Sequence, residues 1–285
     1  MTPPNIQDFF SFVEKREAMR LHKMQHGNTK TFKDKILANH RFCNINREHD
    51  AVTVWMAQNI RAKLYDAPMY VTAPCIFLAR IYNEPKTLVH LADDLLRQDF
   101  DKALCTALEL KKTQSVLRGA YMVVSNGIHN ANKPTVVYFT QCAKALTESV
   151  KAAGAIGSFE DLAKAMLPVE GCGPFYYNQV VADLRYMPIS QHFPDWDTFV
   201  LAGPGTQRGL NRLHNRKVDA NVRQGTAKAE LLAVRDIAST SLSKDVVGYY
   251  KDINNLSNSF CEYDKYCRGR EQLLNGKRLT LRKYN

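Results

Sequence analysis

The chain has 285 residues, enough to bury a substantial core, and its 45% hydrophobic and 24% charged residues exclude wholesale disorder. Its charge balance is unusual, because 39 Lys and Arg against 28 Asp and Glu give a net charge of +11. A field of that sign attracts polyanions, and nucleic acid is the commonest polyanionic partner of a basic protein. The composition therefore predicts a soluble protein that binds nucleic acid.

Seven cysteines stand singly without any C-x-x-C pair, which favours a reducing compartment over a disulfide framework. The start, MTPPNIQDFF, lacks the charged and apolar regions of a signal peptide, and no apolar run is long enough to cross a membrane. We therefore expect a cytoplasmic protein with no membrane partner. His22 and His26 are four residues apart, but no second ligand pair follows, so no metal site is predicted. Assistance by Mg²⁺ stays open.

Helical periodicity dominates the chain from its first apolar residues onward. The stretch that begins IQDFF places its apolar residues on one stripe and its basic residues on the other faces. Ser158, followed by Asp161, has the spacing of a helix N-cap, and Gly154 is a stop signal. We expect helices over 6–24, 132–154, 157–167, 226–240 and 243–268.

Only MVVSNG (122–127) alternates in the way of a short strand, so the chain is predicted to be all-α with about a dozen helices. We expect one helical catalytic domain over 1–270 and a loose basic tail over 271–285. No G-x-x-x-x-G-K-[ST] motif is present, and no G-x-G-x-x-G follows a strand. A nucleotide kinase that acts by itself is therefore not expected.

Two glycine hairpins, 167–186 and 201–213, each combine an apolar residue, a G-x-G turn and a helix. Glycines one residue apart allow positive φ and close backbone approach, and amides at the following helix start attract phosphate. The second hairpin is similar to that of helix-hairpin-helix DNA-binding proteins, with Gly209 where the helices pack. The residues expected to contact DNA phosphates are Gly203, Gly205, Thr206, Arg208 and Arg212.

The first hairpin also admits an alternative activity. Asp195 and Asp197 follow it at about the distance at which helix-hairpin-helix DNA glycosylases carry an aspartate. They either serve a glycosylase or lyase reaction or cap a helix that starts at Trp196.

Three stretches together carry a family resemblance: RFCNINREHDAVTVW, GPFYYNQVVADLRY followed by AGPGTQRGLNR, and CEYDKYCR. They resemble the α-glutamyl/putrescinyl thymine pyrophosphorylase family, whose relatives include the helical domain of the phage 5-hydroxymethyluridine DNA kinases. The similarity spans nearly the whole chain. It implies a fold related to helix-hairpin-helix DNA glycosylases and a role in thymidine hypermodification of DNA, chiefly in bacteriophages, so that the protein would act in the host cytoplasm.

The resemblance implies a transferase. A 5-hydroxymethyluracil in DNA that already carries a phosphate or pyrophosphate would lose it, and an amine such as putrescine or an amino acid would take its place. Kinase relatives carry a separate P-loop domain that this sequence lacks. The protein would therefore act after a 5-hydroxymethyluridine DNA kinase, which is a candidate partner.

The first stretch supplies most of the candidate substrate contacts. Its arginines offer forked donors that suit a phosphate group, and its first asparagine suits the edge of a pyrimidine. Glu48, His49 or Asp50 is the candidate acceptor of a proton from the incoming ammonium; alternatively Asp50 caps the next helix while Arg47 pairs with it. The residues that match the family's motif are Arg41, Asn44, Arg47 and Asp50.

The other stretches add candidate catalytic groups. Glu262 and Lys265 are neighbours on a helix and form either a plain ion pair or a catalytic pair. In the second case Lys265 neutralises the leaving group, or acts as a nucleophile if its pKa is depressed. Asp183 is a further catalytic candidate, and Gln179 and Tyr186 are expected on the same helical face, lining a substrate pocket.

Besides the glycosylase or lyase, a second competing hypothesis is a non-catalytic DNA-binding partner of a base kinase. The polar character of the first stretch argues against it, because phosphate binding needs only lysines, arginines and backbone amides.

Overall fold

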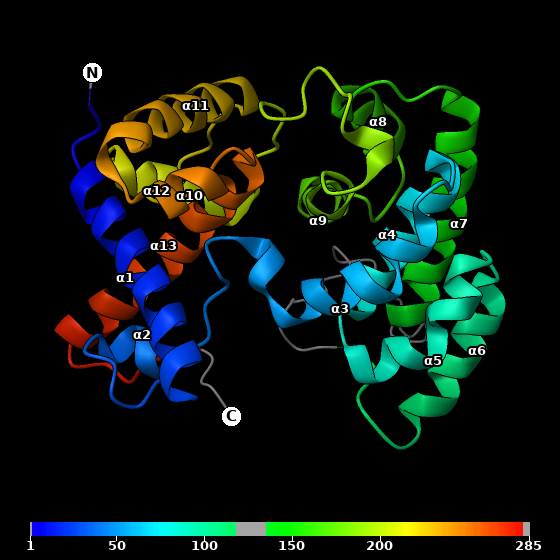
Figure 1. Cartoon of the computed structure of the whole chain (residues 1–285), viewed down its shortest axis with the longest axis horizontal. Helices are drawn as coiled ribbons and strands as arrows, with labels where there is room; N and C mark the ends of the chain where they lie inside the picture. Colours follow the sequence, from blue (N-terminus) through cyan, green and yellow to red (C-terminus); the bar gives the residue numbers. More distant parts are fainter. Residues whose placement is uncertain (1, 118–134, 282–285) are drawn as a thin grey trace. The chain divides into compact units, whose positions relative to one another are not determined.

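The computed structural model describes residues 2–117 and 135–281 (Figure 1). Within these residues the regular elements are thirteen α-helices and three short 3-10 helices, and no strand is present. The prediction of an all-α chain is therefore confirmed. The candidate strand at 122–127 lies outside the described residues. No helix in the described part of the chain is both long enough and apolar enough to cross a lipid bilayer.

The chain divides into two compact units, where the sequence predicted one domain over 1–270. Unit 1 comprises residues 1–50 and 197–285, and unit 2 comprises residues 51–196. Helical periodicity tells which face of a helix is buried but not which helices share a core, so the pattern could not reveal the division. The two units are described separately below.

Unit 1 is organised around one long helix, α13, which packs against α1, α2, α10 and α11 (Figure 1). Aromatic residues form the centre of its core: Phe9 stacks on Phe260 with ring centroids 4.1 Å apart, and Tyr263 packs edge-on against Phe9. The helices of unit 1 are α1 (Ile6–His26), α2 (Lys35–Asn39), η1 (Arg47–His49), α10 (Pro204–Leu213), α11 (Gln224–Ser241), α12 (Lys244–Tyr249) and α13 (Ile253–Leu274).

The predicted helix over 243–268 is two helices, α12 and α13. The break falls where Asp252 takes an extended conformation and accepts a hydrogen bond from the backbone N–H of Asn254, which makes it the N-cap of α13. Gly248, a residue of low helix propensity in this range, does not cause the break, because it lies inside α12. A side chain that caps a new helix thus overrides a continuous helical pattern.

The predicted loose tail over 271–285 is also wrong where it is described. α13 continues to Leu274, and the segment after it turns back along the helix. Gln272 and Thr280 exchange two hydrogen bonds, and Leu281 is buried in the core of unit 1. The hydrogen bonds of Thr280 and the burial of Leu281 together hold this segment against α13.

Unit 2 is centred on α4, which is buried along almost its whole length and packs against α5, α7 and α9. Two local predictions are confirmed here: α7 ends before Gly154, whose φ is +73°, and the Ser158 side chain accepts a hydrogen bond from the Asp161 N–H. The helices of unit 2 are α3 (Ala51–Asn59), η2 (Arg61–Leu64), α4 (Met69–Tyr82), α5 (Pro85–Leu96), α6 (Phe100–Lys111), α7 (Thr135–Ala153), α8 (Phe159–Met166), α9 (Pro174–Leu184) and η3 (Pro188–Ser190).

Candidate functional site

The first family-like stretch meets α13 in unit 1. The backbone N–H of Cys43 donates to Glu262 Oε2 at 3.1 Å, and the Arg47 guanidinium donates to Asn258 Oδ1 at 3.2 Å. These contacts join segments that are 219 and 211 residues apart in the chain. We call the polar side chains gathered here the polar cluster; it consists of Asn44, Arg47, Asp50, Asn254, Asn258, Glu262 and Lys265.

The segment that carries Asn44, Arg47 and Asp50 is held by its own side chains. Asp50 accepts a hydrogen bond from the Asn44 N–H at 2.9 Å through one oxygen and from Arg47 Nε at 2.7 Å through the other. Arg16 of α1 donates to the backbone carbonyls before Asn44 and, at 2.8 Å, to Asn44 Oδ1. The predicted pairing of Arg47 with Asp50 is confirmed, and the turn is fixed before any ligand binds.

Glu262 and Lys265 form an ion pair on α13 with a distance of 3.0 Å between Glu262 Oε2 and Lys265 Nζ. The ammonium also lies 4.5 Å from the ring centroid of Phe42, within the range of a cation–π contact. Burial is the largest single influence and works against its charge, but the Glu262 carboxylate and the other groups around the ammonium together outweigh burial, and the pKa of Lys265 is raised. The depressed pKa that a nucleophilic lysine requires is therefore absent, and Lys265 acts as a fixed cation.

Other polar groups in and near the site differ in how many hydrogen bonds and ion pairs they form with described residues. Glu262 Oε1 accepts no hydrogen bond from a described residue, so this oxygen is open to a ligand. Arg41 is half-buried and, within the described part of the chain, makes neither a hydrogen bond nor an ion pair. Burial, followed by Glu262, raises the pKa of the Cys43 thiol to about 12, which excludes Cys43 as a thiolate nucleophile.

Two asparagines of α13 were missed by the sequence reasoning. Both amide atoms of Asn254, which is 6% exposed, and the Nδ2 of Asn258 are buried without a hydrogen-bond partner among the described residues. Spacings of four and three place them on one face of α13 with Glu262 and Lys265. Since buried polar atoms are nearly always paired, unpaired amides beside charged groups are places where a ligand or a water molecule would find hydrogen-bond partners. The asparagine-rich run INNLSNS was the signal that could have revealed them.

The second glycine hairpin forms the start of α10, with Gly203 as N-cap and Pro204 as the first helical residue. The positive φ that the G-x-G pattern suggested is absent from both of its glycines. Gly205 and Gly209 serve close packing instead: a Cβ added to Gly205 would lie 2.3 Å from Cys261 Sγ, and one added to Gly209 would lie 2.2 Å from the carbonyl oxygen of Phe260, whereas nothing lies within 4 Å of a Cβ added to Gly203. The hairpin therefore allows α10 to touch α13.

The polar side chains of this hairpin also face α13. Arg208 and Arg212 donate to the buried carboxylate of Asp264 at 3.0 and 2.8 Å, and Arg212 also pairs with Glu271. The hydroxyl of Thr206 donates to the backbone carbonyl of a residue on α13. These side chains are already engaged in the protein, which leaves the backbone amides at the start of α10 as the groups that best suit a phosphate.

The candidate residues of the second stretch belong to unit 2. Asp183 is fully buried and accepts two hydrogen bonds from Arg80, at 2.6 and 2.8 Å, with Arg61 at 3.8 Å. This is the geometry of a structural ion pair. Gln179 is buried on α9, whereas Tyr186 lies beyond the end of α9 with Arg61 over its ring, so these residues do not share one helical face as predicted.

The aspartates of the glycosylase hypothesis are engaged elsewhere. Asp195 accepts hydrogen bonds from the backbone N–H groups of Phe159 and Glu160 and so caps α8. Asp197 pairs with Arg235. No helix starts at Trp196. The prediction that an aspartate here caps a helix was therefore correct for Asp195, but the helix that it caps is α8.

The described part of the chain shows no obvious metal site, since no three His, Cys, Asp or Glu side chains gather there as metal ligands would.

Comparison with curated proteins and with solved structures found no match. One protein-family model, 5-hmdU DNA kinase, helical domain, matches residues 4–276 and so includes the polar cluster and both glycine hairpins. The match supports the expected relation to these kinases. The chain belongs to the family of the helical domain of 5-hmdU DNA kinases.

Proposed function

We propose that this protein replaces the phosphate or pyrophosphate on a 5-hydroxymethyl-deoxyuridine of DNA with an amine or an amino acid. The observation that carries the proposal is the meeting of two distant motifs in unit 1: the Arg47–Asp50 pair and the Glu262–Lys265 pair lie on the same polar cluster, joined through Asn258 and Cys43. Family membership supports the substrate, since the family is named for kinases of hydroxymethyluridine in DNA.

The reaction needs a cation for the leaving group and an acceptor for a proton. The amine nitrogen forms a bond to the 5-methylene carbon while the bond from that carbon to the phosphate oxygen breaks, and the oxygen keeps the electron pair. Lys265, whose raised pKa keeps it charged, and Arg41, whose donors are free of described partners, suit the departing anion. Glu262 Oε1 suits the proton that the amine releases, and Asp50 holds Arg47 in place.

The base itself requires polar partners. A uracil edge offers an N–H donor between two carbonyl acceptors, which matches the amide of Asn254 and the free Nδ2 of Asn258. In duplex DNA the modified base would have to leave the stack to reach these groups. A fold related to helix-hairpin-helix DNA glycosylases, which the resemblance implies, would be consistent with such flipping and with phosphate contacts at the start of α10.

The test is mass spectrometry of nucleosides. DNA that contains 5-hydroxymethyluracil is phosphorylated by a cognate kinase and then incubated with this protein, with or without Mg²⁺, and a pool of amines and amino acids. We expect a new nucleoside that carries an amine adduct. Glu262→Gln and Lys265→Met should abolish the adduct, and Lys265→Arg should retain part of it, since it keeps the positive charge.

A matched control is Glu109→Gln, which breaks an exposed ion pair of unit 2 with the same chemical change. Release of the base, or a protein–DNA adduct trapped by borohydride through Lys265, would replace the proposal with the glycosylase or lyase. Unchanged nucleosides despite DNA binding would assign a non-catalytic role beside a kinase.

A further inference from the structure

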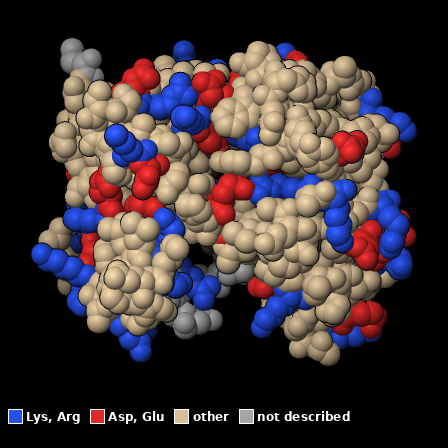
Figure 2. Space-filling view, viewed as in Figure 1, with Lys and Arg blue, Asp and Glu red and all other residues tan. Residues whose placement is uncertain are grey.

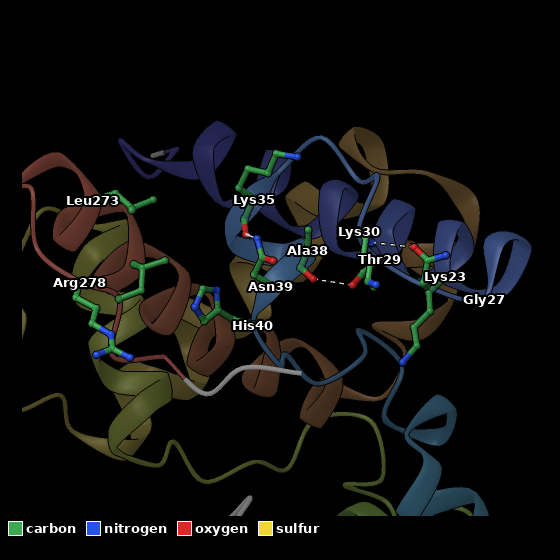
Figure 3. Close-up of a pocket in the computed structure, with 12 residues that line it drawn as sticks. Lys23, Gly27, Thr29, Lys30, Lys35, Ala38, Asn39, His40, Leu273 and Arg278 are labelled. Atoms are coloured by element: carbon green, nitrogen blue, oxygen red, sulfur yellow. Dashed lines mark hydrogen bonds between the residues drawn. The ribbon is translucent and has the colours of Figure 1, made fainter. Parts of the chain in front are cut away.

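A concave site lies at the C-terminal end of α13, beyond the residues of the polar cluster. It has a volume of about 750 Å³, within the range of ligand-binding pockets. Figure 3 shows that its lining comes from the end of α1, the loop that follows, α2, the last turn of α13 and the segment after it. Its charged residues are Lys23, Lys30, Lys35 and Arg278, and none of the described residues that line it is Asp or Glu. We call this site the basic pocket.

The loop that shapes the pocket is rigidly folded. α1 ends at Gly27, whose φ of +71° is in the left-handed region, and the chain turns there. The backbone N–H of Lys30 donates to Asn28 Oδ1, and the buried hydroxyl of Thr29 donates to the carbonyl of Ala38 (Figure 3). These two hydrogen bonds tie the backbone at Lys30 to the loop and the loop to α2.

His40 supplies an independent sign of a ligand in the pocket wall. It is 2% exposed, and its Nδ1 lies 3.1 Å from the carbonyl oxygen of Ile36, so Nδ1 carries a proton and donates. Its Nε2 is buried and has no hydrogen-bond partner among the described residues. A buried polar atom left in this state costs about 1–3 kcal/mol. Nε2 can accept from a ligand hydroxyl or, when protonated, donate to a phosphate oxygen.

The cations of the basic pocket differ from those of the α10 hairpin in their ion pairing. Lys30, Lys35 and Arg278 are exposed and form no ion pair with a described residue, whereas Arg208 and Arg212 both form ion pairs with Asp264. Blue lysine and arginine atoms gather in Figure 2 around the end of unit 1 where Figure 1 labels α2. Cations without an ion pair to a described residue therefore gather at the basic pocket, whereas Arg208 and Arg212 of the hairpin are held by carboxylates of α13.

We propose that the basic pocket binds the sugar–phosphate backbone of DNA. In Figure 3 the labelled cations come from different elements and stand around the pocket on either side of His40, which suits a ligand with successive phosphates better than a single anion. The inference extends the proposed function, but it concerns where the strand is held and not the reaction. It can therefore be tested on unmodified DNA.

The test is fluorescence anisotropy with unmodified single-stranded and duplex DNA over a range of KCl concentrations. The triple variant Lys30→Gln, Lys35→Gln, Arg278→Gln should bind more weakly, with the slope of log K against log salt reduced by about 2–3, because each lost phosphate contact contributes about 0.7–0.9. The matched control Lys86→Gln, Lys111→Gln, Lys151→Gln removes the same charge from exposed residues of unit 2 and should leave the slope nearly unchanged.

The role of His40 is tested separately by ¹⁵N NMR of its side chain. Added DNA should shift the Nε2 resonance, and His40→Asn, which can keep the hydrogen bond to Ile36 while removing Nε2, should weaken binding. A charge-preserving triple variant, Lys30→Arg, Lys35→Arg, Arg278→Lys, should bind like the wild type, which would show that the charge at these positions is what DNA binding requires.

Three results would overturn the inference. The first is an equal loss of slope in both charge-removing triples, which would mean that only net charge matters. The second is an Nε2 resonance that DNA does not move. The third is displacement of DNA by inorganic pyrophosphate at micromolar concentration, which would assign the pocket to a free polyphosphate. Failure to form an amine adduct would leave all three measurements interpretable.

Discussion

The contact between α10 and α13 gives the sharpest test of the structure, because two glycines on it differ in what their neighbours can do. The substitution Gly209→Ala would bring the added Cβ to 2.2 Å from a backbone carbonyl oxygen of α13, at Phe260. In Gly205→Ala the added Cβ would lie 2.3 Å from Cys261 Sγ, which is the end of a side chain and can move. The backbone atoms of a packed helix cannot move in this way.

The expected magnitudes follow from this difference. Gly209→Ala must push the helices apart by about 1 Å to reach an ordinary contact distance, and overpacking of this kind costs about 1–3 kcal/mol, partly offset by about 0.5–1 kcal/mol of helix propensity. Gly205→Ala should cost less, and Gly205→Ala with Cys261→Ala should recover most of the loss. No second substitution can relieve Gly209→Ala in this way, because its added Cβ meets a backbone atom and not a side chain. Gly248→Ala is the control, because nothing lies within 4 Å of its added Cβ.

The assay must follow unit 1 specifically. The two tryptophans of the chain, Trp55 and Trp196, belong to unit 2, so tryptophan fluorescence does not report on α10 or α13. Hydrogen exchange in increasing urea, measured on peptides from these helices, gives the free energy of opening of unit 1. If Gly209→Ala proved as stable as Gly248→Ala, the close approach of α10 to α13 would be refuted.

Three further predictions concern buried and titrating groups. Asp183→Asn should destabilise unit 2 by about 3–5 kcal/mol, because it leaves arginines buried without their carboxylate; an unchanged urea midpoint of tryptophan fluorescence would contradict this. Burial opposes the ionised Asp8, but hydrogen bonds from Arg270 and another side chain outweigh it, and the pKa of Asp8 is lowered. Its stabilisation is therefore complete above the unfolded value near 3.9 and is lost as the pH falls through the folded pKa. Asp8→Asn should flatten that acid limb in a pH series of hydrogen exchange. Finally, the exposed Cys105 should react with maleimide at pH 8 well before Cys43, and the order is read by peptide mass spectrometry; equal rates would disprove the raised thiol pKa.

Local signals of the sequence predicted local structure well. Ser158 and Gly154 mark helix ends through interactions within four residues, and both were found where expected. The pairing of Arg47 with Asp50, three residues apart, was foreseen for the same reason. The contact of Arg47 with Asn258 was not, because no periodic pattern tells which distant helix a turn will meet.

The arginines of the second glycine hairpin show a different limit of prediction from sequence. Arg208 and Arg212 follow a DNA-binding motif in sequence, and their position alone suggested phosphate contacts. The packing of α10 on α13 places the buried Asp264 against both of them. A buried carboxylate demands a cation, and the nearest arginines supply it. Whether a basic residue faces DNA or a buried acid depends on tertiary packing, which the sequence motif does not contain.

Residues of α13 contribute to both proposed sites, so the distance between the two sites along this helix can be calculated. Lys265 of the polar cluster and Leu273 of the basic pocket are eight residues apart on α13, or about 12 Å at 1.5 Å per residue. A DNA strand advances about 3.4 Å per nucleotide, so a strand that runs beside α13 spans this distance in about three to four nucleotides. We therefore expect an asymmetric minimal substrate. Oligonucleotides shortened to fewer than about four nucleotides on one side of the modified base should lose affinity, and those shortened on the other side should not. Equal losses from both sides, measured by anisotropy, would mean that the two sites do not share one strand along α13.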